Sequence, residues 1–203
     1  MRAVPWERHR AESTGDLGQA RIRGGTRGGT LGTLSGMPVR NPRLLVTVSS
    51  YQKAVRVPRR EIERLVAFVA RLEGVRFAEA DIAVVGAREI AALNRRYLDR
   101  AGPTDVLSFD LSESPAPSRS RGGRRNRGGV PIVAQIVVCA DVAVREARLR
   151  QTPPQREMML YVVHGLLHLT GYEDATVRGA ARMHAREEEM LREFLEGRRR
   201  RRE

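Results

Sequence analysis

Strand signals and helix signals alternate through the first part of this chain, and only helix signals follow residue 140. Short runs rich in Val, Ile and Leu predict strands at 44–50, 81–85, 104–110 and 131–140. Apolar residues at helical spacing predict helices at 58–74, 87–98, 142–150, 153–169 and 176–196. These elements must bury their apolar faces against one another. The expected fold is therefore a single α+β domain, with a small mixed sheet of about four strands and helices packed on it.

Prolines, glycines and one aspartate fall at the ends of the predicted helices. Pro58 fits the first turn of a helix, where a missing N–H costs nothing, and Gly74 fits the left-handed residue that ends one. Gly171 has the same role after the segment 153–169. Asp141 is predicted to be the N-cap of the following helix, because its short carboxylate can accept from the first amides.

The net charge of +13 is concentrated in three segments. Residues 1–36, 112–130 and 198–203 carry net charges of +3, +4 and +4. We predict that the first is a disordered Arg/Gly-rich arm or a mis-annotated start before Met37, the second a disordered insertion and the third a basic tail. The folded domain is then expected to span 37–197. Such segments attract phosphate without sequence preference, although a general Arg-rich composition would also explain them.

Cysteine content and hydropathy favour a reducing, aqueous compartment. Cys139 is the only cysteine, so the chain cannot form an internal disulfide, and no disulfide partner is expected. No run approaches eighteen consecutive apolar residues, so no membrane span is expected. The single cysteine fits a reducing cytoplasm.

The segment HGLLHLTGYED, residues 164–174, is typical of a metal site. His164 and His168 are four residues apart, so on a helix they project from one face, one turn apart, and can bind one ion. Gly171 can then turn the chain sharply, so that a third ligand returns to the same ion. The alternative is a pair of core histidines hydrogen-bonded to backbone. The long predicted helix of the C-terminal half would carry the site in either case.

Gly165 occupies the place of the glutamate in the zinc-protease motif HExxH. In those proteases the glutamate is the general base. Its absence argues against peptide hydrolysis by that route. It leaves open the metal-assisted hydrolysis of another ester.

Two blocks of this sequence resemble the YbeY family, the bacterial rRNA maturation factors. The family's zinc motif, H-G-x-x-H-L-x-G-Y-D-H, is similar to residues 164–174. Its second block, L-N followed by P-T-D-V-L-S-F, is similar to 93–94 and 103–109. The resemblance covers about residues 43–196.

This resemblance implies a zinc-dependent endoribonuclease, specific for single-stranded RNA, with one zinc per chain. It implies a role in 16S rRNA 3′-end maturation and in ribosome assembly and quality control. The expected partners are RNA, in particular rRNA, and the small ribosomal subunit, in the cytoplasm.

The expected metal ligands are His164, His168 and Asp174. Asp174 stands where the family has its third histidine, and a carboxylate oxygen reaches zinc at about the same distance as an imidazole nitrogen. The competing third ligands are Glu173, one residue off register, and His184. A further alternative is that Asp174 only caps the last helix. His184 is expected on the surface with the acidic residues 187–189, and Met183 in the core.

The remaining candidate site residues come from the second block and its surroundings. The expected catalytic residues are Arg95, Arg96 and Glu173, and the expected substrate-binding residues are Arg100, Thr104 and Asp105. The arginines suit phosphate groups as planar forks, but an exposed helix face would also carry them. Asp105 would equally suit a turn cap.

Three departures from the family pattern bear on activity. Leu98 stands where many members have an arginine, and Asp174 replaces a histidine. The family's Gly-Asp-Ile on the last predicted strand is Ala134-Gln135-Ile136 here. A non-catalytic ribosome assembly factor of the same fold is therefore an alternative function. A zinc peptidase with a displaced base is a less favoured one.

Overall fold

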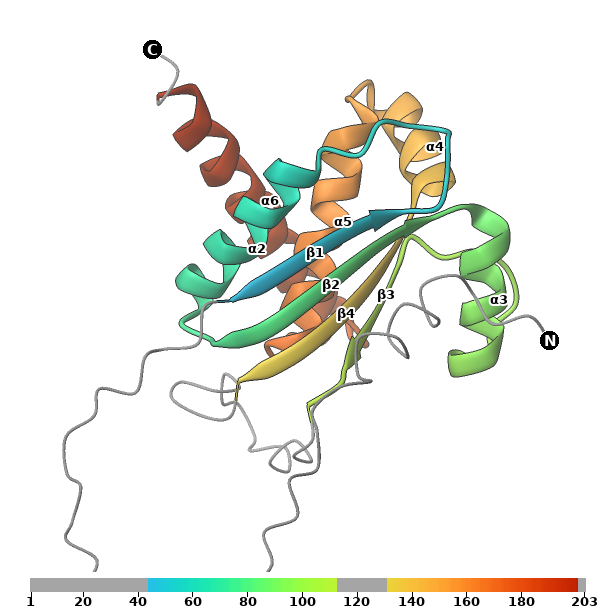
Figure 1. Cartoon of the computed structure of the whole chain (residues 1–203), viewed down its shortest axis with the longest axis horizontal. Coiled ribbons are helices and arrows are strands. Elements are labelled where there is room, and N and C mark those ends of the chain that lie inside the picture. The colour runs from blue at the N-terminus through green and yellow to red at the C-terminus, as the bar shows by residue number, and fades with distance from the viewer. Residues whose placement is uncertain (1–43, 113–130, 201–203) are drawn as a thin grey trace, which may run out of the picture. The chain divides into compact units, whose positions relative to one another are not determined.

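The computed structural model describes residues 44–112 and 131–200, which form a four-stranded sheet and five helices (Figure 1). The elements in chain order are β1 Leu45–Ser50, α2 Arg59–Glu73, β2 Phe77–Val85, α3 Ala87–Leu98, β3 Val106–Asp110, β4 Ile132–Cys139, α4 Ala140–Arg150, α5 Pro154–Leu169 and α6 Val177–Arg199. The predicted arm 1–36, nearly all of the predicted insertion 112–130 and the end of the predicted basic tail lie outside the described residues.

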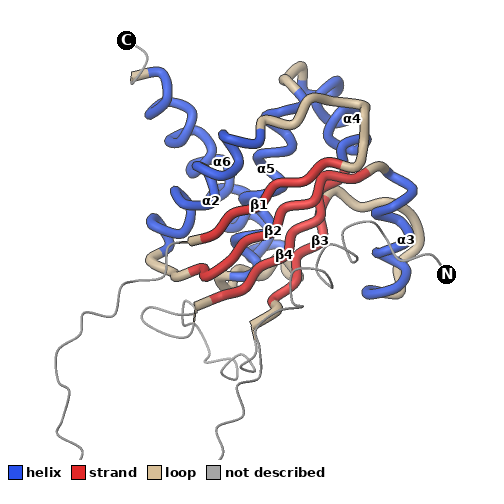
Figure 2. Tube along the Cα trace, in the orientation of Figure 1, coloured by secondary structure: helices blue, strands red, loops and turns tan. Residues whose placement is uncertain are grey.

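The sheet is mixed, as predicted, with the strand order β1-β2-β4-β3 (Figure 2). β1, β2 and β4 are parallel, and β3 is an antiparallel edge strand beside β4. β2 begins at Phe77, four residues before the predicted start, because Phe77 and Glu79 already pair with β4 and Glu79 also pairs with β1. β3 begins at Val106, two residues after the predicted start.

Helix α5 occupies the centre of the molecule. It packs against β3 and β4 on one side and against α2, α4 and α6 on others. In Figure 1, α2 and α5 lie across one face of the sheet, and α3 lies beyond the end at which β2 finishes. Most of α5 is buried, including Met158, Val162 and Leu166, so the helix is held on several sides. Side chains projecting from α5 are therefore fixed by packing rather than by the helix alone.

The prolines and glycines predicted at helix ends are found there, but the predicted role of Asp141 is wrong. Gly74 ends α2 in the left-handed conformation, with φ 65°. α4 begins at Ala140, one residue before Asp141, so Asp141 is not its N-cap. Instead the Asp141 carboxylate accepts from the Ala87 N–H at 2.6 Å, and this contact caps α3. The prediction was wrong because Asp141 lies next to the start of α3 in space. The Ala87 amide there has no acceptor within its own helix.

Among the described residues, no helix combines the length and the apolar character that a membrane span requires. The longest, α6, carries charged residues along most of its length.

Candidate metal centre

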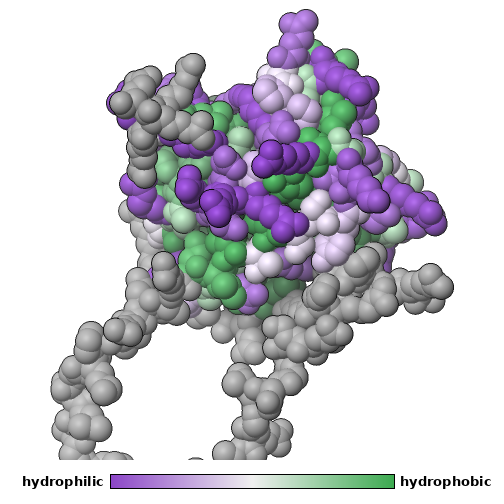
Figure 3. All heavy atoms as spheres, turned by 45° about the horizontal axis from the view of Figure 1, so that its top comes forward, coloured by the Kyte–Doolittle hydropathy of each residue, from purple (hydrophilic) through white to green (hydrophobic). Residues whose placement is uncertain are grey.

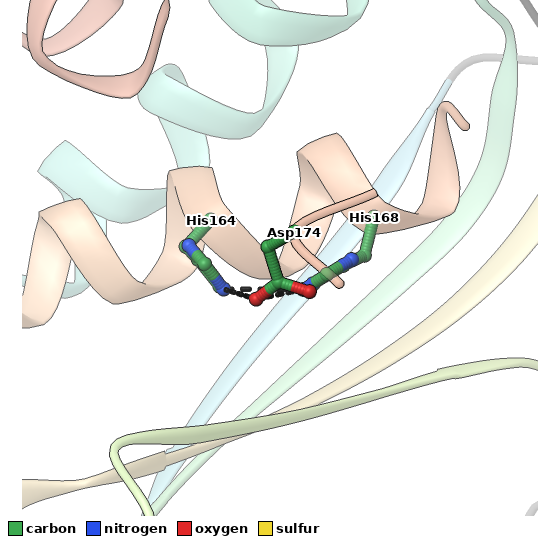
Figure 4. Close-up of side chains that lie close together, drawn as sticks. All are labelled: His164, His168 and Asp174. Carbon is green, nitrogen blue, oxygen red and sulfur yellow. Dashed lines mark hydrogen bonds and ion pairs between the residues drawn. The ribbon is translucent and has the colours of Figure 1, made fainter. Parts of the chain in front are cut away.

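His164 and His168 project from one face of α5 toward each other (Figure 4). Both side chains are partly buried. The two rings meet edge to face, with centroids 4.7 Å apart, and their Nε2 atoms are 3.1 Å apart. This is the predicted one-turn spacing, and it brings the two potential ligand atoms together.

The second nitrogen of each ring is already hydrogen-bonded. His164 Nδ1 lies 2.9 Å from Oε2 of Glu187, and His168 Nδ1 lies 3.2 Å from the backbone oxygen of Tyr172. A carboxylate and a carbonyl only accept, so both Nδ1 atoms must carry the proton. When both rings are neutral, each presents a lone pair at Nε2 to the other. A cation between them would satisfy both, which is the arrangement that metal-binding histidines adopt.

Asp174 brings a carboxylate to the same place (Figure 4). Gly171, with φ 97°, turns the chain after α5, and the following loop returns Asp174 to the helix. Its Oδ2 lies 3.7 Å from Nε2 of His168 and 3.9 Å from Nε2 of His164. One atom from each of these three residues lies within 4.8 Å of the others.

The separations between these atoms suit a shared ion. Zinc bonds to nitrogen and oxygen are about 2.0–2.2 Å, so two atoms that share one zinc are at most about 4.2–4.4 Å apart. The three separations of 3.1, 3.7 and 3.9 Å are within that limit. A set of two imidazoles and one carboxylate is also one that zinc accepts, with a position left for water.

The alternative roles predicted for these residues do not account for the arrangement. The core-histidine interpretation explains the Nδ1 contacts but leaves both Nε2 atoms facing each other. The capping role of Asp174 is wrong, because Thr176 caps α6 and its Oγ1 accepts from the Gly179 N–H at 3.0 Å. The Asp174 side chain, 48% exposed, is thus available to the site.

Glu187 is a site residue that the sequence interpretation missed. It was expected on the surface, but it is buried, and it joins His164 to His184, whose Nδ1 lies 2.8 Å from the other carboxylate oxygen. A signal was present in the sequence. On α6, position 187 falls on the apolar stripe that contains Met183 and Met190, both buried as core residues. A carboxylate on such a stripe needs a buried partner.

The acidic groups around His164 make the site electronegative. Burial lowers the pKa of the His164 imidazole, but the hydrogen bond and charge of Glu187 outweigh it, with help from the charges of Asp105 and Asp174. The net effect raises the pKa above its ordinary value. A site that stabilises a proton on the imidazole in this way will also attract a metal cation.

Glu187→Gln is expected to weaken metal binding about 10–100-fold, the usual effect of losing a carboxylate behind a ligating histidine. Glutamine keeps the shape but not the charge, so it accepts more weakly from the His164 Nδ1–H. Competition with a fluorescent chelator would measure the dissociation constant.

Glu188→Gln is the matched control for that experiment. Glu188 is the next residue on α6, and its carboxylate pairs with Arg156 at 2.6 Å, away from the histidines. Equal metal affinity in Glu187→Gln and the wild type would show that Glu187 does not support the site.

Gly165 lies where α5 touches the sheet. A Cβ at this position would be 3.2 Å from Ile136 and 3.3 Å from Val106, so a side chain there would press on β3 and β4. A glutamate at 165 would therefore point into the sheet and not to the metal group. The local packing leaves no place for the general base of an HExxH protease.

The other predicted site residues are not part of the group of three donors. Asp105 is half-buried at the start of β3, where its Oδ1 accepts from the Val106 N–H and from the Thr104 hydroxyl, each at 2.9 Å. It is thus a turn cap, and its charge also acts on His164. Glu173 is exposed in the loop before α6. Their catalytic and substrate-binding roles stay predictions.

The three predicted arginines are exposed at and just after the end of α3. Arg95 and Arg96 belong to its last turn, and Arg100 follows it. The Arg96 guanidinium lies 5.1 Å from the centre of the Tyr97 ring, and that ring packs on Phe109 of β3. An arginine stacked on a partly exposed tyrosine is a surface that single-stranded RNA can use.

Comparison with known proteins finds one family. The family model "Endoribonuclease YbeY" matches residues 47–195. A protein of that name from Anaeromyxobacter sp. is 37% identical over 144 residues, which cover 71% of this chain and 68% of the relative. One from Salinibacter ruber is 34% identical over 143 residues, covering 68% and 87%. A solution structure from Thermotoga maritima aligns with a TM-score of 0.49 and 22% identity, over 76% of this chain and 92% of that one.

Proposed function

The chain belongs to the YbeY family of endoribonucleases, and from that premise we propose that it is a zinc-dependent enzyme that cuts single-stranded RNA. The proposed setting is 16S rRNA 3′-end maturation with ribosome assembly and quality control. The substrate is then rRNA, the partner is the small ribosomal subunit, and the location is the cytoplasm.

The observation that carries the proposal is the pair of facing Nε2 atoms with Asp174 beside them. His164, His168 and Asp174 would hold the metal. When bound, it would polarise a phosphoryl oxygen and lower the pKa of a water molecule toward neutrality. This chemistry suits phosphodiester hydrolysis and needs no glutamate at position 165.

The other residues have supporting roles in this proposal. Glu187 and the carbonyl of Tyr172 hold the imidazoles in one tautomer and orientation. Arg95, Arg96 and Arg100 hold RNA phosphates at the end of α3. Thr104, Asp105 and Glu173 form the rim, and Glu173 would accept a proton from water.

A substrate comparison tests the proposed function. Protein of known zinc content is incubated with a single-stranded RNA, the same RNA as a duplex, and an unfolded protein. We expect cleavage of the single strand only, loss of cleavage on chelation, and recovery when zinc is returned. Zinc-loaded protein that cuts nothing would favour the non-catalytic assembly factor, and cleavage of the unfolded protein would favour the peptidase.

A further inference from the structure

A concave site lies apart from the metal group, and none of its lining residues belongs to that group. It is a cavity of about 720 Å³ between the loop after β1, the first turns of α2 and the start of α5. Four arginines line it, Arg56, Arg59, Arg60 and Arg64, together with Glu61 and Gln155. Figure 3 looks onto this end of the molecule, where hydrophilic residues gather among smaller apolar areas.

The charge of this arginine pocket is not balanced internally. All four arginines are exposed, and none of them pairs with a carboxylate of the residues that the structure describes. Glu61 is the only acid of the lining, and its Oε1 is bound by Arg198 at 3.0 Å. The pocket therefore keeps a strong positive potential, which favours an anionic ligand.

The backbone of the pocket is held in place before any ligand arrives. Gln52 closes the loop after β1 through two bonds with the backbone of Val55, at 2.9 and 3.0 Å. Gln155 of α5 donates to the carbonyl of Arg56 at 3.4 Å. α2 starts at Arg59, after the N-cap Pro58, without a side-chain cap, so the positive end of its dipole faces the same region.

The basic C-terminal segment starts beside this pocket. The ion pair between Arg198 and Glu61 fixes the end of α6 next to the first turn of α2. The sequence from 198 onward is RRRRRE. Arg198, the first residue of that segment, is therefore held next to the pocket, although the two lie far apart in the sequence.

The pocket and the metal group are on different sides of α5. Gln155 and His164 are nine residues apart, which is about 14 Å along the helix axis and about two and a half turns around it. An RNA that contacts both sites must therefore pass around α5, so it has to be longer than an RNA that binds at the histidines alone.

We propose that the arginine pocket is a second phosphate-binding site, which anchors a distant stretch of a long RNA while another stretch lies at the metal group. Guanidinium groups pair with phosphate oxygens in a bidentate manner and tolerate any base sequence. The pocket would thus supply affinity for long substrates without affecting the chemistry of the cut. This inference rests on the proposed function, since it takes RNA as the ligand.

A pair of charge-matched variants tests the proposal. The pocket variant replaces Arg56, Arg59, Arg60 and Arg64 with glutamine, and the control variant replaces Arg76, Arg88, Arg145 and Arg148, which are also exposed. Binding of a long single-stranded RNA is measured by fluorescence anisotropy over a range of salt, with chelator present to prevent cleavage. Four lost phosphate contacts should reduce the slope of log K against log salt by about 2.8 in the pocket variant. The control should keep nearly the full slope.

Cleavage kinetics provide a second measurement. A general loss of positive charge would not change KM on the long RNA alone. With the long RNA, we expect the pocket variant to show a KM at least about tenfold higher and an unchanged kcat, since the pocket provides binding away from the cut. With a tetranucleotide, both variants should match the wild type. Thermal melts verify that each variant is folded. If the quadruple variant melts early, two double variants replace it, one at positions 56 and 64 and the other at positions 59 and 60.

The outcomes separate this inference from the proposed function. Equal losses of slope in the pocket and control variants would overturn the pocket, and so would slower cleavage of the tetranucleotide in the pocket variant alone. If the wild type cuts no RNA, the proposed function fails, but the binding experiment still decides whether the pocket holds phosphate.

Discussion

His164→Ala and His168→Ala are each expected to remove the bound metal and to retain the fold. RNA cleavage should fall by more than about a hundredfold. Loss of an outer partner of a metal ligand usually costs about 10–100-fold, and loss of the ligand itself should cost more. Mass spectrometry of dialysed protein would give the metal content per chain. Circular dichroism would report the fold.

The two variants should differ in the stability of the metal-free protein. Removing His164 leaves Glu187, a buried carboxylate, without one of its two imidazole partners, and an unsatisfied buried group costs about 1–3 kcal/mol. Both variants lose the contact between the two Nε2 atoms and one contact with Asp174, and removing His168 frees in addition only a backbone carbonyl, that of Tyr172. We therefore expect His164→Ala to melt earlier than His168→Ala.

His184→Ala is the control for both variants. His184 also contacts Glu187, but its side chain is 65% exposed, and it is not one of the three donors that lie together. The His184→Ala variant should therefore keep its bound metal. Unchanged metal content in both His164→Ala and His168→Ala would mean that these histidines are only part of the packed core.

Local sequence patterns were sufficient to predict the framework of the fold. α3 has the bounds 87–98 that its apolar spacing predicts, and α5 starts at Pro154, one residue after the predicted start, and ends before Gly171 as predicted. Both features depend on residues a few positions apart, whose geometry is set by the helix itself. The facing histidines were predictable for the same reason.

The contacts that orient the site were not predictable in this way, because their partners are distant in the sequence. Glu187 follows His164 by 23 residues, and its role depends on how α6 packs on α5. Asp141 caps a helix that begins 54 residues earlier. The tight contact of Gly165 with Ile136 likewise depends on the register between a helix and a sheet. Only tertiary packing determines such pairs.

Asp174→Ala is expected to lose the metal nearly as completely as the histidine variants. The carboxylate is the only donor from outside α5 in the group, and it comes closest to Nε2 of His168, at 3.7 Å. With alanine there, two imidazoles remain, which is one ligand fewer than the usual catalytic zinc site. The loop should keep its form, since Gly171 and Thr176 define its two ends.

Asp174→His restores the third imidazole of the family pattern and is expected to keep zinc with at least equal affinity. The carboxylate lowers the net charge of a divalent site from +2 to +1, so the wild-type metal should be the weaker Lewis acid. The Asp174 carboxylate is also a harder ligand than imidazole, which shifts the selectivity of the wild-type site toward manganese. Titrating both proteins with zinc and manganese should therefore show a higher zinc-to-manganese preference in Asp174→His.

Glu173→Ala tests whether the third ligand must be at position 174 or whether any acidic residue of the loop is sufficient. Glu173 is the adjacent carboxylate and is equally accessible, but it is not part of the group of three donors. Because adjacent residues of a loop point in different directions, only one of the two can reach the Nε2 atoms in this conformation. Metal retained in Asp174→Ala and lost in Glu173→Ala would assign the site to Glu173. Loss in Asp174→Ala alone, with recovery in Asp174→His, would place the third ligand at 174.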